Sequence, residues 1–223
     1  MFQQNENNRT RVKRCGLTSL EDARYASGAM ADYLGFIFVP GSKRYVNPDH
    51  AAAIIAWTEG PEAVGVFMNQ PLDDVIDTIG KTGVKLAQLH GQETVEYCSL
   101  IPVPIIKTIS VGPDDDLTSL RAKMKPYEGV VAYFLFDTAK DGQSGGTGET
   151  FDWSVIEDLE TDTPWFVAGG IGPENVKAAV KQLRPYGVDA NSKLESEPGV
   201  KQLEKYEHFF DEIRSIWSNQ DPD

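Results

Sequence analysis

The sequence predicts an α/β protein of the (β/α)8 barrel, or TIM barrel, class. Short strand-like runs alternate with helix-like segments along the 223 residues, and no Pro/Gly-rich linker interrupts them. This alternation predicts a parallel sheet covered by helices. Eight units of roughly 27 residues each suit a closed barrel near the lower end of its usual length. An open doubly wound sheet is the alternative, because a strand count does not show closure.

The strand candidates are short, and several are apolar at consecutive positions, as expected for strands buried on both faces. In chain order they are residues 11–15, 32–38, 63–68, 84–89, 103–109, 130–136, 165–169 and 186–190.

Helical segments are expected between these strands, at 19–31, 48–58, 71–81, 92–100, 113–124, 152–159, 173–183 and 201–217. The last has the most regular pattern, with apolar residues recurring at helical spacing from Leu203 to Trp217. We therefore expect one barrel domain over residues 11–218, flanked by a disordered tail at 1–10 and a short tail at 219–223.

Charge and cysteine content bound the class of protein. The formal net charge of −13 disfavours nucleic acid and anionic membranes as partners. No apolar run approaches the length of a membrane span, and the polar first ten residues lack the features of a secretory signal. Cys15 and Cys98 are the only cysteines, which favours free thiols in the cytoplasm over a disulfide framework.

In a barrel, catalytic groups lie at the C-terminal ends of the strands. The unusual residues of this chain gather at those positions, whereas the opposite ends carry ordinary turn residues. They are Cys15, residues 40–46 (PGSKRYV), Gln88, His90, Asp137, residues 169–172 (GGIG) and residues 189–195.

The segment 169–180, GGIGPENVKAAV, joins an apolar strand to a helix. Its glycines allow close approach of the backbone to a ligand, and free N–H groups at a helix start favour a phosphate. Barrels often bind phosphate after strands seven and eight. A flexible turn is the alternative. A dinucleotide fingerprint is not favoured, because Asn175 replaces its third glycine.

The segment 142–153, GQSGGTGETFDW, carries four glycines but lacks the spacing of a P-loop. Two interpretations stay open: a mobile loop that closes over a site, and a solvated connection between strand and helix.

Cys15 and Asp137 are the candidate reactive groups. Cys15 is either a small buried apolar residue or a functional thiol, whose thiolate form the nearby Lys13 would favour. Asp137 follows a strongly apolar strand, so a raised pKa that suits a general acid competes with a capping or ion-pair role. Cys98 is expected to be core packing. The three histidines lack metal-ligand spacing, so no metal is expected.

With these segments assembled, the chain closely resembles the phosphoribosylanthranilate isomerase family over about residues 12–214. The resemblance rests on motifs in the same order along the chain: KRCGLTSLEDA (13–23), DYLGFIFVPGSKRYV (32–46), QLHGQE (88–93), the Asp137 strand end, GGTGETFDW (145–153), AGGIGPENV (168–176) and YGVDANSKLESEPGVK (186–201).

The resemblance implies an Amadori rearrangement in tryptophan biosynthesis without a cofactor, by a monomer or homodimer. It assigns Asp137 as the general acid that opens the sugar ring and Cys15 as the general base that removes the C2′ proton. It implies substrate contacts at Arg44, which would bind the anthranilate carboxylate, and at Gln88, His90 and Asp189. It implies phosphate contacts at Gly170, Gly172, Asn191, Ser192 and Lys193.

Two positions depart from the family pattern. Lys193 replaces a glycine of the last phosphate turn, so it is either strained at positive φ or helps to hold the phosphate. Arg14 replaces an apolar residue; alternation points it outward under the helices, where we expect an acidic partner. Two alternatives therefore stay open: a catalytically silent phosphate-binding barrel, and an isomerase of the related aminoaldose of histidine biosynthesis, against which Cys15 argues because that enzyme type typically uses an aspartate base.

Overall fold

A closed barrel of eight parallel strands forms the centre of the molecule. The computed structural model describes residues 9–140, 143–144 and 150–220. Its barrel strands are β1 (Arg11–Arg14), β2 (Tyr33–Ile37), β3 (Glu62–Phe67), β4 (Leu86–Leu89), β5 (Ile105–Val111), β6 (Tyr133–Lys140), β8 (Trp165–Val167) and β9 (Gly187–Ala190). Each strand pairs in parallel with both neighbours, and β1 closes the sheet against β9. The barrel prediction is confirmed, and the open sheet is excluded.

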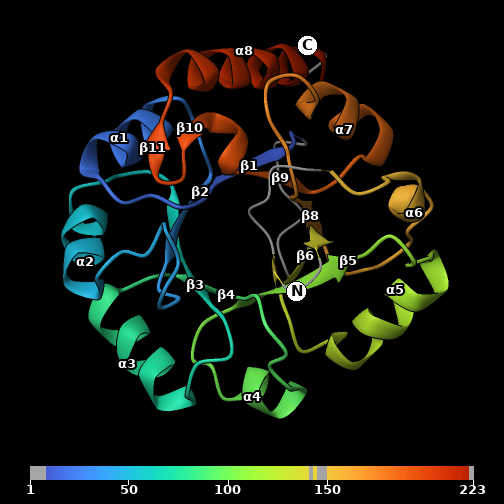
Figure 1. Cartoon of the computed structure of the whole chain (residues 1–223), viewed down its shortest axis with the longest axis horizontal. Coiled ribbons are helices and arrows are strands. Elements are labelled where there is room, and N and C mark those ends of the chain that lie inside the picture. The colour runs from blue at the N-terminus through green and yellow to red at the C-terminus, as the bar shows by residue number, and fades with distance from the viewer. Residues whose placement is uncertain (1–8, 141–142, 145–149, 221–223) are drawn as a thin grey trace.

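The helices form a ring around these strands, as Figure 1 shows. They are α1 (Leu20–Gly28), α2 (Pro48–Ala56), α3 (Leu72–Thr82), α4 (Val95–Ser99), α5 (Leu117–Met124), α6 (Ser154–Glu157), α7 (Val176–Leu183) and α8 (Leu203–Gln220). All eight lie inside or overlap the expected segments, and most are shorter.

Side-chain caps define several helix starts. Ser19 accepts a hydrogen bond from the Asp22 N–H at the start of α1, and Asn47 caps α2 ahead of a proline at its first position. Asp116 and Ser119 form a reciprocal capping box on α5. These local signals start α2 at the expected residue 48 and α1 one residue after the expected start, and they start α5 at Leu117, later than the expected 113.

Two elements at the catalytic end of the barrel were not expected from the sequence. Strand β6 runs on past the barrel and pairs in antiparallel fashion with β7 (Gln143–Ser144), so Asp137 lies within a strand instead of ending it. After β9, a 3-10 turn η2 (Ser192–Leu194) leads into a hairpin of β10 (Glu195–Glu197) and β11 (Val200–Lys201). Half of the predicted loop 142–153 lies outside the described residues.

The core has two parts. The larger fills the space between the outer face of the sheet and the helices, and includes Phe209, Phe210 and Ile213 of α8. The smaller closes the N-terminal half of the barrel with aromatic rings, among them Tyr33 and Phe166 in edge-to-face contact. The bottom of the barrel is therefore packed solid, and the polar inward-facing residues lie above this layer.

Arg14 points outward against α8, as alternation predicts, but the expected acidic partner is absent among the described residues. Its guanidinium donates to the Tyr206 hydroxyl (2.5 Å) and to the carbonyls of Ala190 (2.6 Å) and Cys15, and lies over the Tyr206 ring. The prediction of an ion pair is wrong because an aromatic face and strand-end carbonyls, not a carboxylate, stabilise this fully buried cation. Its Nη2 has no partner among the described residues.

The packed chain begins before β1. Arg9 pairs with Asp32 and lies over the Trp217 ring, and Trp217 donates to the Thr10 carbonyl. These contacts join the first strand to the last helix. None of the described helices is both long enough and apolar enough to cross a membrane.

Candidate active site

A cavity of about 550 Å³ opens at the C-terminal ends of the strands. It brings together nine of the eleven predicted site residues: Cys15, Arg44, Gln88, His90, Asp137, Gly170, Asp189, Asn191 and Ser192. Gly172 and Lys193 do not line it. The remaining wall includes apolar side chains such as Ile37, Val39, Met68 and Ile171, which suit an aromatic ring.

Cys15 follows β1 directly, and two glycines make room around it. A Cβ atom on Gly35 of the neighbouring strand β2 would lie 2.8 Å from the Cys15 Sγ. Gly16 adopts φ +71°, and a Cβ there would lie 2.9 Å from the Arg44 Cδ. Gly35 is therefore needed for close packing against the thiol, and Gly16 for the close approach of Arg44 to the residue after the thiol.

The groups around the Cys15 thiol shift its pKa in opposite directions. Burial raises the pKa of Cys15, while the ammonium of Lys13 lowers it and the Asp189 carboxylate raises it again. The Lys13 Nζ lies 2.8 Å from the Asp189 Oδ2, and both side chains are nearly fully buried. Lys13 acts in the expected direction, but burial outweighs it, so the net shift disfavours the thiolate.

Asp137 is buried on β6, at the point where pairing with β8 has just ended at Phe136 and Val167. Its Oδ1 accepts a hydrogen bond from the Thr138 N–H (2.8 Å). Burial, followed by the negative charge of Asp189, raises the pKa of Asp137 to about 7. A carboxylic acid that keeps its proton near neutral pH suits a general acid.

His90 lies at the cavity wall beside this carboxyl group. Its Nδ1 lies 3.2 Å from the Gln88 Nε2 and 3.3 Å from the Thr108 Oγ1. Burial, with the charges of Lys13 and Lys107, lowers the pKa of His90 to about 4 although Glu93 opposes this shift. The imidazole is therefore neutral at pH 7, and an Nδ1 that accepts from the Gln88 amide leaves the proton on Nε2.

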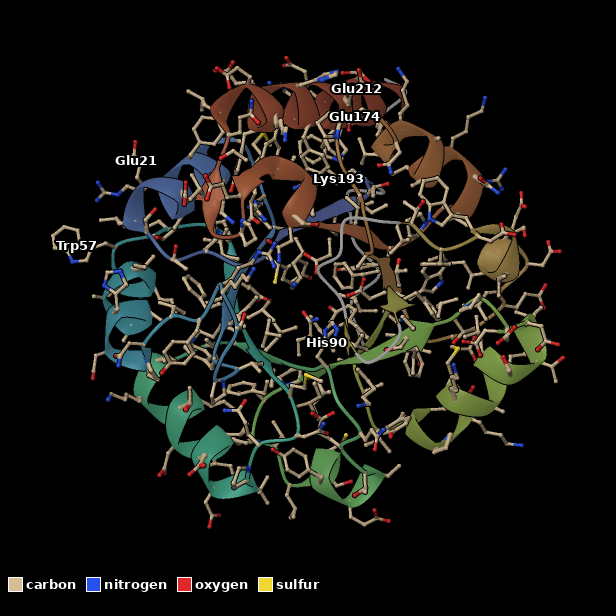
Figure 2. All side chains as sticks on the ribbon, viewed as in Figure 1. Glu21, Trp57, His90, Glu174, Lys193 and Glu212 are labelled. Atoms are coloured by element: carbon tan, nitrogen blue, oxygen red, sulfur yellow. The ribbon has the colours of Figure 1, made fainter. Side chains whose placement is uncertain are left out.

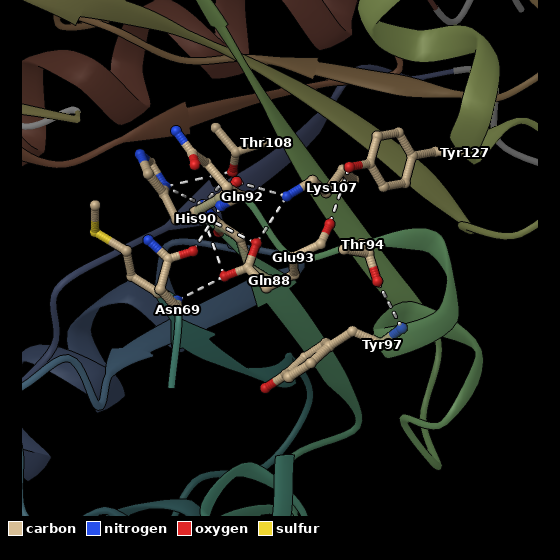
Figure 3. Close-up of polar contacts among 12 residues, drawn as sticks. Asn69, Gln88, His90, Gln92, Glu93, Thr94, Tyr97, Lys107, Thr108 and Tyr127 are labelled. Carbon is tan, nitrogen blue, oxygen red and sulfur yellow. Dashed lines mark hydrogen bonds and ion pairs between the residues drawn. The ribbon is translucent and has the colours of Figure 1, made fainter. Parts of the chain in front are cut away.

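A buried polar network supports the loop that carries His90, as Figure 3 shows. Lys107 donates to Glu93 (2.7 Å) and to the Gly91 carbonyl (2.7 Å). Glu93 also accepts from the backbone N–H groups of Gly91 and Asn69. The loop after β4 is thereby tied to β3 and β5, which holds His90 in place.

Arg44, in the loop after β2, lines the cavity and also forms an ion pair with Glu195 (2.7 Å). Glu195, in turn, pairs with Lys201 across the β10–β11 hairpin. Neither Glu195 nor Lys201 is assigned a role by the sequence pattern alone. The motif that contains them was visible, but nothing in the spacing indicated that Arg44 would meet them.

The GGIG turn has the conformation expected of a ligand-binding backbone. Gly169 and Gly170 have φ of +76° and +69°, and no described residue accepts a hydrogen bond from the Gly170 N–H. Gly172 serves packing instead: its N–H donates to the Asn175 Oδ1, and a Cβ there would lie 2.6 Å from the Lys193 Cβ.

The last turn carries Asn191 and Ser192 at the cavity and Lys193 at the surface. Positive φ among non-glycine described residues occurs at Met30, Asn69 and Arg184, so the strain expected at Lys193 is absent. Figure 2 shows Lys193 on the side of the barrel toward α8, whereas His90 lies inside the ring of strands. Phosphate binding by the Lys193 ammonium stays a prediction.

The described part of the chain holds no group of three or more His, Cys, Asp or Glu side chains arranged for a metal ion. The cavity instead combines proton-transfer groups, one arginine, a glycine turn and apolar walls. This arrangement suits a phosphorylated, carboxylate-bearing aromatic substrate.

Comparison with known proteins agrees with this geometry. The family model described as "N-(5'phosphoribosyl)anthranilate (PRA) isomerase" matches residues 12–212. The N-(5'-phosphoribosyl)anthranilate isomerase of Myxococcus xanthus is 43% identical over 210 residues, covering 92% of this chain and 97% of that relative. That of Geobacter metallireducens is 40% identical over 200 residues, covering 89% and 96%.

Solved structures show the same likeness. The crystal structure of phosphoribosyl anthranilate isomerase from Thermotoga maritima superposes with a TM-score of 0.82 at 33% identity, over 93% of this chain and all of that one. Another isomerase structure, in complex with reduced 1-(o-carboxyphenylamino)-1-deoxyribulose 5-phosphate, has a TM-score of 0.79 at 31% identity over the same shares. The chain therefore belongs to the N-(5'-phosphoribosyl)anthranilate isomerase family.

Proposed function

We propose that this chain converts N-(5'-phosphoribosyl)anthranilate, an aminoaldose, into the aminoketose 1-(2-carboxyphenylamino)-1-deoxyribulose 5-phosphate in tryptophan biosynthesis. The observation that carries the proposal is the joint placement of Cys15, directly after β1, and Asp137, on β6, in one cavity, although two strands separate β1 from β6 in the barrel. A substrate held between them is accessible to both groups.

Asp137 is the general acid. Its proton passes to the furanose ring oxygen, the C1′–O bond breaks, and the nitrogen lone pair forms a protonated Schiff base. A pKa near 7 supplies this proton at neutral pH. His90, whose Nε2 lies 3.5 Å from the Asp137 Oδ2, is neutral at pH 7. Because it carries no positive charge, it does not lower the pKa of Asp137, and the carboxyl group keeps its proton.

Cys15 is the general base. Its thiolate removes the proton from C2′, and the electron pair neutralises the Schiff base to give an enolamine, which tautomerises to the ketone. The substrate's own nitrogen supplies the electron sink, so these proton transfers need no cofactor. Lys13 is placed to stabilise the thiolate against the unfavourable effect of burial.

Binding groups surround these two residues. We assign the anthranilate carboxylate to Arg44 and the anthranilate ring to the apolar wall that includes Val39 and Met68. The phosphate lies against the Gly170 turn and the turn at Asn191 and Ser192, where backbone N–H groups are available. Gln88 and Asp189 contact the sugar.

The test is turnover of N-(5'-phosphoribosyl)anthranilate by the wild type, Cys15→Ala and Asp137→Asn. We expect the wild type to turn over this substrate. Turnover should fall in each variant by roughly 10²- to 10⁴-fold, the contribution typical of a general acid or base. A wild type that binds the phosphorylated ligand but turns nothing over would disprove the isomerase function. Turnover that survives in one variant would remove only that residue's role.

We further propose that the protein works in the cytoplasm as a monomer or homodimer. Both cysteines are free and buried, which supports a reducing compartment. A solved relative from Thermotoga maritima is described as a dimeric isomerase from which monomers were generated, which supports a homodimer and shows that the barrel can exist as a monomer there. Analytical ultracentrifugation distinguishes them for this chain.

A further inference from the structure

The guanidinium of Arg44 is held by a residue 151 positions away in the sequence. Its Nε donates to both Glu195 carboxylate oxygens, at 3.1 and 3.0 Å, and its Nη2 donates to the Oε2 at 2.7 Å. Both side chains are largely buried, with exposed fractions of 12% and 2%. A charge-assisted pair with this many bonds fixes the plane as well as the position of the guanidinium.

Glu195 occupies one of the two edges through which a guanidinium can bind a carboxylate. The Nε–Nη2 edge is taken, whereas the Arg44 Nη1 donates to no described residue. Because Arg44 also lines the cavity, its remaining Nη1–Nη2 edge is available to a second carboxylate.

Lys201 changes the charge of this cluster. Its ammonium pairs with the Glu195 Oε1, and the two residues face each other in the β10–β11 hairpin. Arg44 and Glu195 alone sum to zero charge, so they would attract an anion weakly; with Lys201 the three groups sum to +1. Burial and the charge of Arg14 lower the pKa of Lys201 to about 8, while Glu195 and Asp22 oppose this shift, so it stays protonated at pH 7.

The side chain of Asn191, which follows β9, connects this cluster to Cys15. With its amide nitrogen turned toward two acceptors, Asn191 donates to the Cys15 carbonyl and to the Glu195 Oε1, each at 3.2 Å. The Lys205 ammonium donates to the Glu195 carbonyl (2.9 Å), so α8 also holds this segment. The cluster is therefore anchored on two sides.

We propose that Glu195 and Lys201 are positioning residues that make Arg44 selective for a substrate carboxylate. Glu195 orients the guanidinium so that its free edge faces the cavity, and Lys201 neutralises Glu195 so that the positive charge of Arg44 is directed at the ligand. This inference rests on the proposed function, since it assigns the carboxylate to the anthranilate ring.

The test separates orientation from charge. Two probes are used at pH 7: reduced 1-(o-carboxyphenylamino)-1-deoxyribulose 5-phosphate, and the same compound without the carboxyl group. Lys201→Met keeps the Arg44–Glu195 pair but brings the cluster charge to zero. The double variant Glu195→Gln/Lys201→Met keeps the cluster charge at +1 but removes the orienting carboxylate. Dissociation constants for both probes are measured by titration calorimetry.

We expect the wild type to prefer the carboxylated probe roughly 10- to 100-fold, as a charge-assisted bidentate contact predicts. Lys201→Met and the double variant should each lose about tenfold of this preference, with affinity for the probe without the carboxyl group unchanged. Lys201→Arg should restore the preference. Arg44→Met should abolish it, and adding Lys201→Met to Arg44→Met should lower it no further.

The controls are Asp49→Asn and Lys81→Met, which break an exposed ion pair whose residues do not line the cavity and should change neither affinity. Equal loss for both probes, or no loss, would overturn the inference, because the cluster would then serve only to hold the hairpin. A wild type that binds neither probe would disprove the proposed function itself. If one of the two variants does not fold, the other decides by the same measurement.

Discussion

The Nε2 atom of His90 lies 3.5 Å from the Oδ2 of Asp137, a contact that is too long for a strong hydrogen bond and that is not an ion pair at neutral pH. Burial lowers the pKa of the histidine to about 4 and raises the pKa of the aspartate to about 7. Between these values the imidazole is neutral and the carboxyl group is protonated. Burial in one polar pocket thus keeps both side chains uncharged.

The pH profile of kcat/KM should reflect an acid whose pKa lies below that of the base. Asp137 titrates near pH 7, while burial raises the pKa of the Cys15 thiol above its ordinary value. The productive form needs a protonated Asp137 and a Cys15 thiolate, so activity should rise with pH up to about 7, level off, and decline above the pKa of the thiol.

Direct titrations assign the two limbs of that profile. Thiolate absorbance should follow the alkaline limb, and the carbon chemical shift of Asp137 should follow the acidic limb. The opposite assignment, with the thiolate forming near pH 7, would contradict the electrostatic account of the site.

Asp137→Asn should make the protein more stable than the wild type at high pH, although it strongly lowers activity. The folded-state pKa near 7 lies above the ordinary value of 3.8, so the wild type loses stability as the pH rises through 7. The variant lacks this loss. Its advantage in free energy of unfolding should grow by about 2 kcal/mol between pH 5.5 and pH 8, as urea titrations would measure. A constant difference would mean that Asp137 ionises freely in the fold.

Gly35→Ala should impair catalysis, whereas Gly80→Ala should stabilise the fold. A Cβ at Gly35 would lie 2.8 Å from the Cys15 Sγ and 3.0 Å from its Cα, so the thiol must move. Nothing lies within 4 Å of a Cβ at Gly80, which is in the interior of α3. We expect kcat to fall by roughly tenfold or more in Gly35→Ala. In Gly80→Ala the free energy of unfolding should rise by about 0.5–1 kcal/mol. Steady-state kinetics and thermal unfolding of both variants check this, and full activity in Gly35→Ala would show that the thiol position is not critical.

Arg14→Leu should destabilise the protein, and Arg14→Leu/Tyr206→Phe should recover most of the loss. The single variant leaves the buried Tyr206 hydroxyl without the guanidinium that donates to it. Leaving such a group unpaired costs about 1–3 kcal/mol. The double variant removes both polar groups, which is often tolerated. Chemical unfolding of the three variants, Tyr206→Phe included, gives the coupling energy; additive losses would show that the pair does not interact.

The sequence by itself predicted the barrel and most of the residues that line its cavity. Alternating strand and helix patterns placed eight units, and the rule that barrel chemistry lies at strand ends selected Cys15, Asp137 and Gly170. The barrel, and the meeting of these three residues at one cavity, could be predicted because both depend on local periodicity and on the position of a residue within its own unit.

The tertiary structure decided the protonation states of the site residues and the partners of Arg44 and Arg14. Nothing near Arg44 or Arg14 in the chain indicated Glu195, 151 residues away, or Tyr206, 192 residues away. Lys13 beside Cys15 suggested a thiolate, but burial and Asp189 outweigh it. The physical reason is that strand periodicity is a property of neighbouring residues, whereas desolvation and Coulomb interactions sum over every group that the closed barrel brings together.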